Sequence, residues 1–268
     1  MQPLISVVMA VYNGGTLLRE TIESILNQTF CDFEFIIVDD GSTDETVEII
    51  RSYADPRIRL IQPGRLANQS KCLDIGIKQA RASWIARIDA DDPAHPQRLE
   101  LMWQVISKAE GYGVVASDVK IIYGQTRAQW QPVGTEVPVL RDVTRRLLWH
   151  NPIAHSSVFI RRSAYEQAGG FDPALDLMND YWMWAKISKA GWRLGYVPLK
   201  LQGKRIHLGQ HYENKRRLRY LLASAEVQLW VAKELFGLPS ALMWPVALAR
   251  IAYGLLPQTL RARIRSYV

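Results

Sequence analysis

The stretch LISVVMAVY (residues 4–12) is a continuous apolar run rich in valine, and FEFIIVDD (residues 33–40) is a second run of the same kind. Apolar runs without alternation are typical of strands that are buried on both faces, as in parallel sheets. Between them, TLLRETIESILNQ (residues 16–28) places apolar side chains on one face of a helix. The three segments predict a strand, a helix and a second strand.

The alternation of helix and strand continues as far as a cluster of aspartates. The further expected elements are a helix in 42–54, a strand in 58–62, a helix in 70–80 and a strand in 84–88. Ser42 and Glu45 have the spacing of a capping box, so we expect Ser42 to be the N-cap of the first of these helices. Alternating units of this kind predict an α/β domain with a mostly parallel sheet and right-handed crossovers.

The rest of the chain is less regular. Residues 124–150 lose the clear periodicity, residues 155–170 predict a strand, a short helix and a glycine turn, and residues 179–198 predict a helix and a strand. From about residue 212 the pattern is helical and basic, and prolines interrupt it.

Composition places the chain among ordinary globular proteins, with 48% apolar and 22% charged residues in 268. The formal charge of +7 is unevenly distributed: residues 200–268 carry 12 Lys and Arg against 3 Asp and Glu, a net +9, which leaves −2 for the rest. Cys31 and Cys72 have neither a metal-type spacing nor a disulfide framework, and the first residues have no basic signal region. These features favour a reducing cytosol.

Polar, turn-rich segments follow three of the expected strands: VYNGG (11–15), VDDGS (38–42) and IDADD (88–92). The carboxyl ends of strands in an open α/β sheet surround its ligand crevice, so we expect these segments to meet there. Three carboxylates within four positions repel one another and require a positive partner. We identify that partner as Mg²⁺ or Mn²⁺ bound together with a diphosphate. The alternative is that Asp91 and Asp92 only cap the helix that begins near Pro96.

Five segments resemble family 2 glycosyltransferases: ISVVMAVYNGGTLLRETIESILNQTF (5–30), FEFIIVDDGSTDETVEII (33–50), ASWIARIDADDPAHPQRLELM (82–102), NPIAHSSVFIRRSAYEQAGGFD (151–172) and NDYWMWAKI (179–187). The resemblance covers about residues 4–210 in the expected order and is closest to enzymes of bacterial cell-surface polysaccharides. It implies a GT-A fold, a Rossmann-like and mostly parallel sheet flanked by helices. It also implies a nucleotide-diphospho sugar donor, with UDP as the default nucleotide, an inverting transfer and a divalent metal.

The resemblance assigns roles to individual residues. Tyr12 is expected against a uracil ring, and Asp39 is expected to accept a hydrogen bond from the base. Asp91 is the expected metal ligand, Asp89 is expected near the ribose and the sugar, and Asp180 is the expected general base. Relatives commonly have an acidic residue before this base, whereas this chain has asparagine there.

Two further assignments involve departures from the family pattern. His207 follows an arginine two residues earlier, as in relatives whose C-terminal histidine completes the metal shell, and His211 is its rival. Leu73 replaces an arginine that contacts phosphate in many relatives. We expect Lys71 or Arg65 to supply that charge, and we include Lys71 among the residues that bind the nucleotide sugar.

The domain prediction follows from the same pattern. Residues 1–210 form a glycosyltransferase domain, with a nucleotide-sugar half at about 1–120 and an acceptor half at 121–210, and residues 211–268 form a basic amphipathic helical extension. Such helices favour an anionic membrane surface. We expect peripheral attachment to the inner face of the cell membrane, near a glycan or lipid-linked acceptor. The alternatives are that residues 238–257 cross the membrane and that the extension packs on the domain with a solvated basic face.

Rival functions remain open at this stage. Asn179 and Leu73 allow a non-catalytic relative that binds sugar nucleotides without transfer. The basic extension suggests nucleic-acid binding, but it has no recognisable motif for it, and we predict no nucleic-acid partner. The identity of the sugar and of the acceptor, the choice among UDP, GDP and dTDP, and the oligomeric state do not follow from the sequence.

Overall fold

The computed structural model describes residues 2–134, 136–175, 177–206 and 217–256. The expected metal ligand His207 and its rival His211 lie outside these ranges, and so do the basic residues 261–265.

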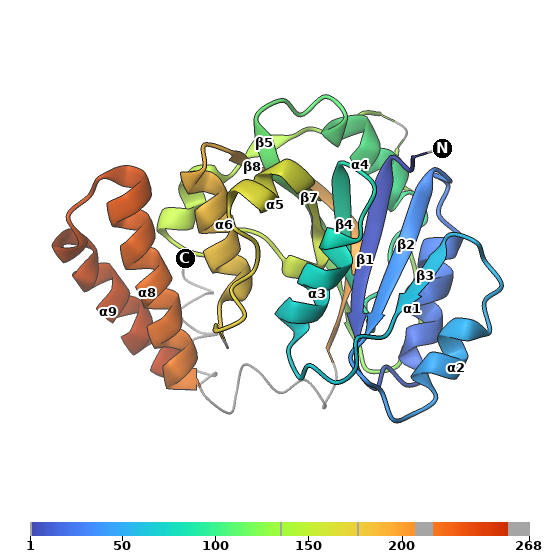
Figure 1. The fold of residues 1–268 in the computed structure, drawn as a ribbon. Coiled ribbons are helices and arrows are strands. Elements are labelled where there is room, and N and C mark those ends of the chain that lie inside the picture. The colour runs from blue at the N-terminus through green and yellow to red at the C-terminus, as the bar shows by residue number, and fades with distance from the viewer. Residues whose placement is uncertain (1, 135, 176, 207–216, 257–268) are drawn as a thin grey trace.

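A mixed sheet forms the centre of the described chain (Figure 1). Its eight strands have the order β3-β2-β1-β4-β7-β5-β8-β6. The strands are β1 (Ile5–Val11), β2 (Phe33–Asp39), β3 (Ile58–Ile61), β4 (Trp84–Asp89), β5 (Tyr112–Tyr123), β6 (Arg141–Asp142), β7 (Val158–Arg161) and β8 (Arg193–Ile206). Strands β1 to β4 pair in parallel, as do β5 and β8, whereas β7 and β6 are antiparallel to their neighbours. The predicted α/β class with a mostly parallel sheet is confirmed.

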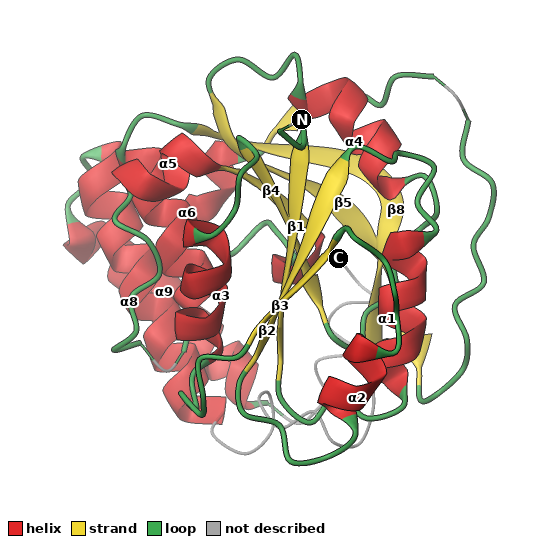
Figure 2. Ribbon diagram, turned by 45° about the vertical axis from the view of Figure 1, so that its right-hand side comes forward, coloured by secondary structure: helices red, strands yellow, loops and turns green. Residues whose placement is uncertain are grey.

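Helices cover both faces of the sheet (Figure 2). The α-helices are α1 (Leu17–Leu26), α2 (Thr46–Arg51), α3 (Gln69–Lys78), α4 (Arg98–Ile106), α5 (Arg162–Gln167), α6 (Asn179–Lys189), α8 (Arg217–Phe236) and α9 (Ser240–Leu255), and the 3₁₀ helices are η1 (Thr144–Leu148) and η2 (His155–Ser157). α1, α2 and α4 bury one apolar cluster against the sheet, and α3, α5, α6 and α8 bury another on the opposite face.

The first predicted elements form because most of their apolar side chains are buried in the core. Every residue of β2 is buried, and α1 buries Leu18, Ile22 and Ile25, the face that the helical spacing indicated. The predicted capping box is wrong. Ser42 instead accepts a hydrogen bond from the Asn13 amide at 2.9 Å, and α2 begins only at Thr46. The side chain of Asp44 accepts from the Thr46 amide at 3.1 Å, but the N-cap of α2 is Glu45, whose side chain makes no capping hydrogen bond.

The C-terminal helices lie at the end of the sheet away from β3 (Figure 1). α8 packs on α6, where Trp182 and Trp230 meet edge to face with ring centroids 5.3 Å apart, and Lys189 pairs with Glu234 at 2.5 Å. α9 packs on α8. Within the described ranges, no helix combines the length and the apolar character that a membrane crossing needs.

Candidate functional site

A cavity of about 420 Å³ opens where β1, β2 and β4 end. The strand register brings these ends together, because Val11 pairs with Asp39 and Ala10 pairs with Asp89. The walls come from residues 10–14 at the end of β1, Asp40 after β2, residues 89–91 at the end of β4, and residues of the segment 65–72 that leads into and begins α3. Its volume is in the usual range for small-molecule sites. The predicted meeting of the three strand ends is confirmed.

The backbone amides of the β1–α1 loop are already occupied. The amide of Gly14 donates to Thr46 Oγ1 at 2.8 Å, and the amide of Gly15 donates to Asp44 at 3.2 Å. A glycine-rich phosphate loop needs such amides free to cradle an anion. These two glycine amides are therefore not free to bind a diphosphate in that way.

Arg65 lies on the wall of the cavity and stacks on Tyr12. Its guanidinium carbon is 3.7 Å from the centre of the Tyr12 ring, and Tyr12 is 46% exposed. Asp40 holds the same segment, because its carboxylate pairs with Arg65 and accepts from the amides of Leu66 and Ala67. Gly41 is required at this contact: its φ is +69°, and a Cβ there would lie 3.1 Å from the Arg65 backbone.

The remaining residues predicted to contact the nucleotide lie at different depths. Asp39 is 1% exposed, and its carboxylate accepts from the Ser42 amide at 3.2 Å. Lys71 has an exposed position in the first turn of α3 and is not among the residues that line the cavity. Leu73 is buried in the core and is not among the residues that line the cavity. Of the two cations that we considered for the diphosphate, Arg65 is the one on the cavity wall.

Asp89 has a positive partner that the pattern of carboxylates did not reveal. Arg87 donates to both carboxylate oxygens, at 2.9 and 2.5 Å, and Gln69 donates to one of them at 3.2 Å. Arg87 is only 4% exposed, so the pair is largely shielded from water. The assignment of the positive partner to a metal alone is therefore incomplete, because the protein itself compensates part of the negative charge.

Asp91 and Asp92 differ in their surroundings. Asp91 lines the cavity, whereas Asp92 is 4% exposed and accepts from the Arg205 amide at 2.6 Å. Burial and the charges of Asp89 and Asp91 raise the pKa of Asp92 to about 8. This environment gives Asp92 a structural role, because its carboxylate holds the loop after β4 to the end of β8.

The cavity suits a divalent cation that completes its shell from substrate. Asp89 and Asp91 both present carboxylate oxygens on the wall, which are the ligands that Mg²⁺ and Mn²⁺ prefer. Among the described residues, no three side chains of His, Cys, Asp or Glu group closely enough to hold a metal by themselves. A cation bound here would therefore take one or two carboxylates from the protein and its other ligands from a diphosphate.

Asp180 lies in the first turn of α6, where the dipole of the helix favours a carboxylate. The Tyr181 amide donates to one oxygen at 2.8 Å, and Asn151 donates to the other at 2.7 Å. Burial raises the pKa of Asp180, although these hydrogen bonds and the charge of Arg87 oppose the shift. Arg87 therefore acts electrostatically on both Asp89 and Asp180.

Asn179, the departure from the acidic family pattern, donates to the Leu175 carbonyl at 2.8 Å and helps to close the turn before α6.

Sequence reasoning overlooked Arg87, although a charged residue inside the apolar run WIARI was a visible signal. Its partner Asp89 is two residues later, which is the same face of the strand.

Comparison with known proteins gives a consistent assignment. The model of the family described as "Glycosyl transferase family 2" matches residues 6–169. The putative glycosyltransferase EpsE of Bacillus subtilis is 32% identical over 72% of this chain and 69% of its own length. The succinoglycan biosynthesis protein ExoO of Rhizobium meliloti is 29% identical over 73% of this chain, which covers 59% of ExoO.

Two solved structures have the same fold. TarS 1–349 of S. aureus in complex with UDP-GlcNAc superposes with a TM-score of 0.66 at 16% identity, covering 94% of this chain and 81% of TarS. The mannosyltransferase PcManGT of Pyrobaculum calidifontis in complex with GDP-Man and Mn²⁺ gives 0.67 at 20% identity, covering 99% of this chain and 79% of PcManGT. The predicted GT-A type of fold is confirmed.

Proposed function

Since the chain belongs to glycosyl transferase family 2, we propose that it is an inverting glycosyltransferase that depends on a divalent metal. The donor is a nucleotide-diphospho sugar, and the acceptor is a hydroxyl group of a glycan or lipid-linked molecule in cell-surface polysaccharide synthesis. The name of the relative ExoO and the donor complexes of TarS and PcManGT support this proposal.

One observation carries the proposal: the cavity at the strand ends joins an exposed aromatic ring, a cation and two carboxylates. Tyr12 and Arg65 form one wall, and Asp89 and Asp91 form another. A planar ring and guanidinium suit a base and a phosphate, whereas the carboxylates suit a metal and the hydroxyl groups of a sugar. Asp39 and Lys71 remain proposed contacts of the nucleotide sugar, and His207 remains a proposed metal ligand.

In the proposed reaction, Asp180 accepts the proton of the acceptor hydroxyl as that oxygen attacks the anomeric carbon. The bond from this carbon to the diphosphate breaks on the opposite side, and its electron pair leaves with the nucleoside diphosphate, so the configuration inverts. Burial raises the pKa of Asp180 toward the operating range of a general base. Its bonds from Asn151 and Tyr181 orient the carboxylate.

Asp91, with Asp89 beside it, would hold the cation, which would neutralise the charge that develops on the departing diphosphate. Arg65 stacks on the ring where the base is expected, so it either moves aside or lies against the bound base. Its position makes it a second source of positive charge for the nucleotide.

A donor screen tests the proposed function. Purified protein is incubated with UDP-, GDP- and dTDP-sugars and Mn²⁺, with a hydroxyl acceptor, and release of each nucleoside diphosphate is measured. We expect release from one class of donor, at a rate that falls in EDTA. NMR of the product should show an inverted anomeric centre. Retention of configuration would contradict the mechanism, and donor binding without transfer or hydrolysis would favour the non-catalytic alternative that Asn179 suggests.

We also propose that α9 attaches the protein to the inner surface of the cell membrane. Its exposed face consists of apolar residues: Ala241, Leu242, Trp244, Pro245, Leu248, Ala249, Ala252 and Leu255. Arg250, the one charged residue of α9, turns inward and donates to the Trp149 carbonyl and to Gln228. An apolar helix face next to basic segments suits an anionic interface.

Flotation with vesicles that contain anionic lipid tests this attachment. Leu248→Glu should reduce the fraction of protein that floats with the vesicles, because it places a charge in the apolar face. Gln167→Glu adds the same charge at an exposed position of α5 and should float like the wild type. Equal flotation of all three proteins would contradict a role of α9.

A further inference from the structure

The loop that carries Asp91 and Asp92 is bonded to the end of β8. The amide of Gly203 donates to the Pro93 carbonyl at 2.8 Å, and the amide of Arg205 donates to Asp92 Oδ1 at 2.6 Å. A Cβ at Gly203 would lie 2.7 Å from the Pro93 carbonyl oxygen, so only glycine allows this close approach. The loop after β4 is thus held by a strand more than a hundred positions later in the chain.

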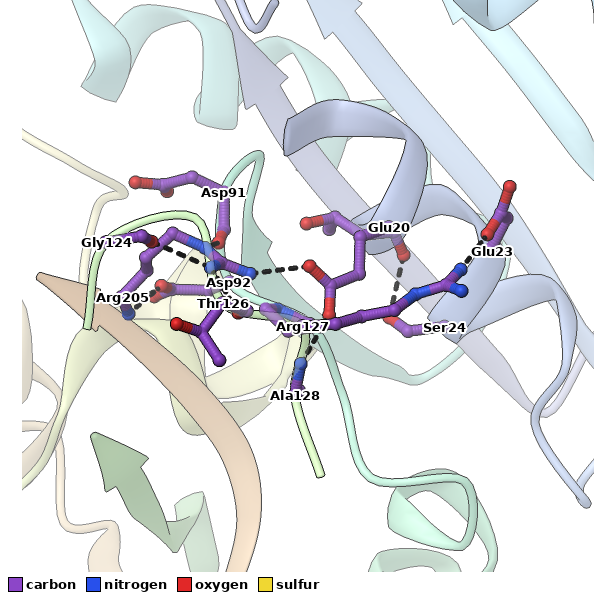
Figure 3. Close-up of polar contacts among 12 residues, drawn as sticks. Glu20, Glu23, Ser24, Asp91, Asp92, Gly124, Thr126, Arg127, Ala128 and Arg205 are labelled. Atoms are coloured by element: carbon purple, nitrogen blue, oxygen red, sulfur yellow. Dashed lines mark hydrogen bonds and ion pairs between the residues drawn. The ribbon is translucent and has the colours of Figure 1, made fainter. Parts of the chain in front are cut away.

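The Arg205 side chain joins this loop to two other parts of the molecule (Figure 3). Its Nε donates to the carbonyl of Asp91 at 2.9 Å. Its Nη1 donates to the carbonyls of Gly124 and Thr126, at 2.9 and 2.8 Å. Its Nη2 pairs with Glu20 Oε2 on α1 at 2.6 Å. One planar group therefore connects the aspartate loop, the segment 124–128 and a helix.

This arrangement is specific to arginine. The side chain is 0% exposed, and a buried guanidinium is tolerated only when its charge and its donors are matched. Glu20 supplies the charge, and its second oxygen accepts from the Ala128 amide at 2.7 Å, which anchors the 124–128 segment. Lysine has no planar fork and cannot reach three segments in the same way.

Arg205 does not line the cavity, but Asp91 does. The bond to the Asp91 carbonyl fixes the backbone from which that carboxylate extends, and Figure 3 shows the carboxylate on the side away from Glu20. A metal ligand binds well only when its position is fixed before the ion arrives. We propose that Arg205 is a positioning residue for the Asp91 carboxylate, acting through the backbone of the loop. This inference rests on the proposed metal-binding function of Asp91.

The test is a titration of the wild-type protein and its variants with Mn²⁺ in the presence of UDP. Binding is monitored by the loss of the EPR signal of the free ion. Thermal unfolding of each protein is measured in parallel. Arg205→Lys should weaken Mn²⁺ binding by about 10- to 100-fold, as expected for groups that orient a metal ligand. Glu20→Gln keeps an acceptor for the Ala128 amide and removes the charge partner, so it should weaken binding in the same direction to a smaller extent. If Arg205→Lys does not fold, the Mn²⁺ affinity of Glu20→Gln tests the inference in its place.

Arg127→Ala is the matched control, because Arg127 lies on the same segment in an exposed ion pair with Glu23. It should bind Mn²⁺ like the wild type. Arg205→Lys and Glu20→Gln proteins that unfold at lower temperature but keep the wild-type Mn²⁺ affinity would overturn the inference. A wild-type protein that takes up no Mn²⁺ with any nucleoside diphosphate would instead contradict the proposed function itself, so the two failures are distinguishable.

Discussion

The two ends of the central strands both carry acidic side chains, but in different surroundings. At the start of β2, Glu34 is 2% exposed and lies opposite Ser6 in the strand register. It accepts from Ser6 at 2.7 Å, from the amide of Arg81 at 2.7 Å and from the side chain of Arg59 at 2.7 Å. At the other end, Asp91 lines the cavity.

The pKa values of Glu34 and Asp92 differ in the same way as the surroundings of the two strand ends. Burial alone would raise the pKa of Glu34, but hydrogen bonds from Ser6, Arg81 and Arg59 outweigh it, and the pKa is lowered. Around Asp92, burial and two neighbouring carboxylates dominate, and the pKa is raised to about 8. An acidic cluster whose charge is matched within the protein stabilises the fold, whereas one that retains excess negative charge next to a cavity can bind a cation.

The largest expected effect on transfer activity comes from replacing Asp91. Asp91→Asn removes a carboxylate from the cavity wall, and a metal ion typically stabilises a transition state by several kcal/mol. Transfer should fall by about 10³-fold, because 1.36 kcal/mol corresponds to a factor of ten. The melting temperature should stay near that of the wild type or rise, since one source of repulsion is removed. Near-normal turnover in a kinetic assay would exclude the role.

The second largest effect on activity should come from replacing Asp180. Asp180→Asn should lower kcat by about 10²- to 10³-fold while donor binding is kept, as expected for the loss of a general base. In the wild type, activity should fall as the pH drops through the raised pKa of Asp180, so the acid limb should lie above the ordinary range of about 4. A normal kcat with intact donor binding would refute the assignment.

Glu34→Gln should affect stability and not catalysis. It leaves the surrounding donors incompletely paired, at a cost of about 1–3 kcal/mol in the free energy of unfolding at pH 7. Because the folded-state pKa is lowered, the stabilisation by Glu34 is present above the unfolded-state pKa and is lost as the pH falls through the folded-state value. Urea unfolding should therefore show the difference between variant and wild type shrinking below about pH 4. A difference that is constant from pH 7 to 3 would contradict this account of Glu34.

The smallest effect should come from Arg81→Ala. The Arg81 side chain is 58% exposed and donates to Glu34 at 3.0 Å, whereas the amide of residue 81 remains to donate to the same carboxylate. Exposed ion pairs contribute about 0–1 kcal/mol, so urea unfolding should show a loss in that range. A loss as large as that of Glu34→Gln would mean that the exposed cation, and not the buried donors, stabilises Glu34.

The regular part of the fold was predictable because strands and helices that bury apolar residues leave a local pattern. Ile22 and Ile25 follow helical spacing, and the run from Phe33 onward marks a strand buried on both faces. The meeting of Tyr12 and Asp91 in one cavity followed from the topology of parallel strands.

The parts that sequence reasoning missed are contacts over long separations. Arg205 reaches Asp92 and Glu20, and Arg65 reaches Tyr12, and no local spacing encodes these pairs. The predicted cap at Ser42 failed for a similar reason, since that hydroxyl is occupied by the amide of Asn13 from another loop.

The most direct test of the central claim is calorimetric titration of UDP, GDP and dTDP, each with Mn²⁺, into the wild-type protein, Asp91→Asn and Arg81→Ala. The account predicts that one nucleoside diphosphate binds the wild type and Arg81→Ala with the same affinity, and that binding to Asp91→Asn is at least about tenfold weaker, as expected when a metal ligand is lost. Equal binding to all three proteins, or no binding of any of the three nucleotides to the wild type, would contradict the assignment of the donor site to this end of the strands.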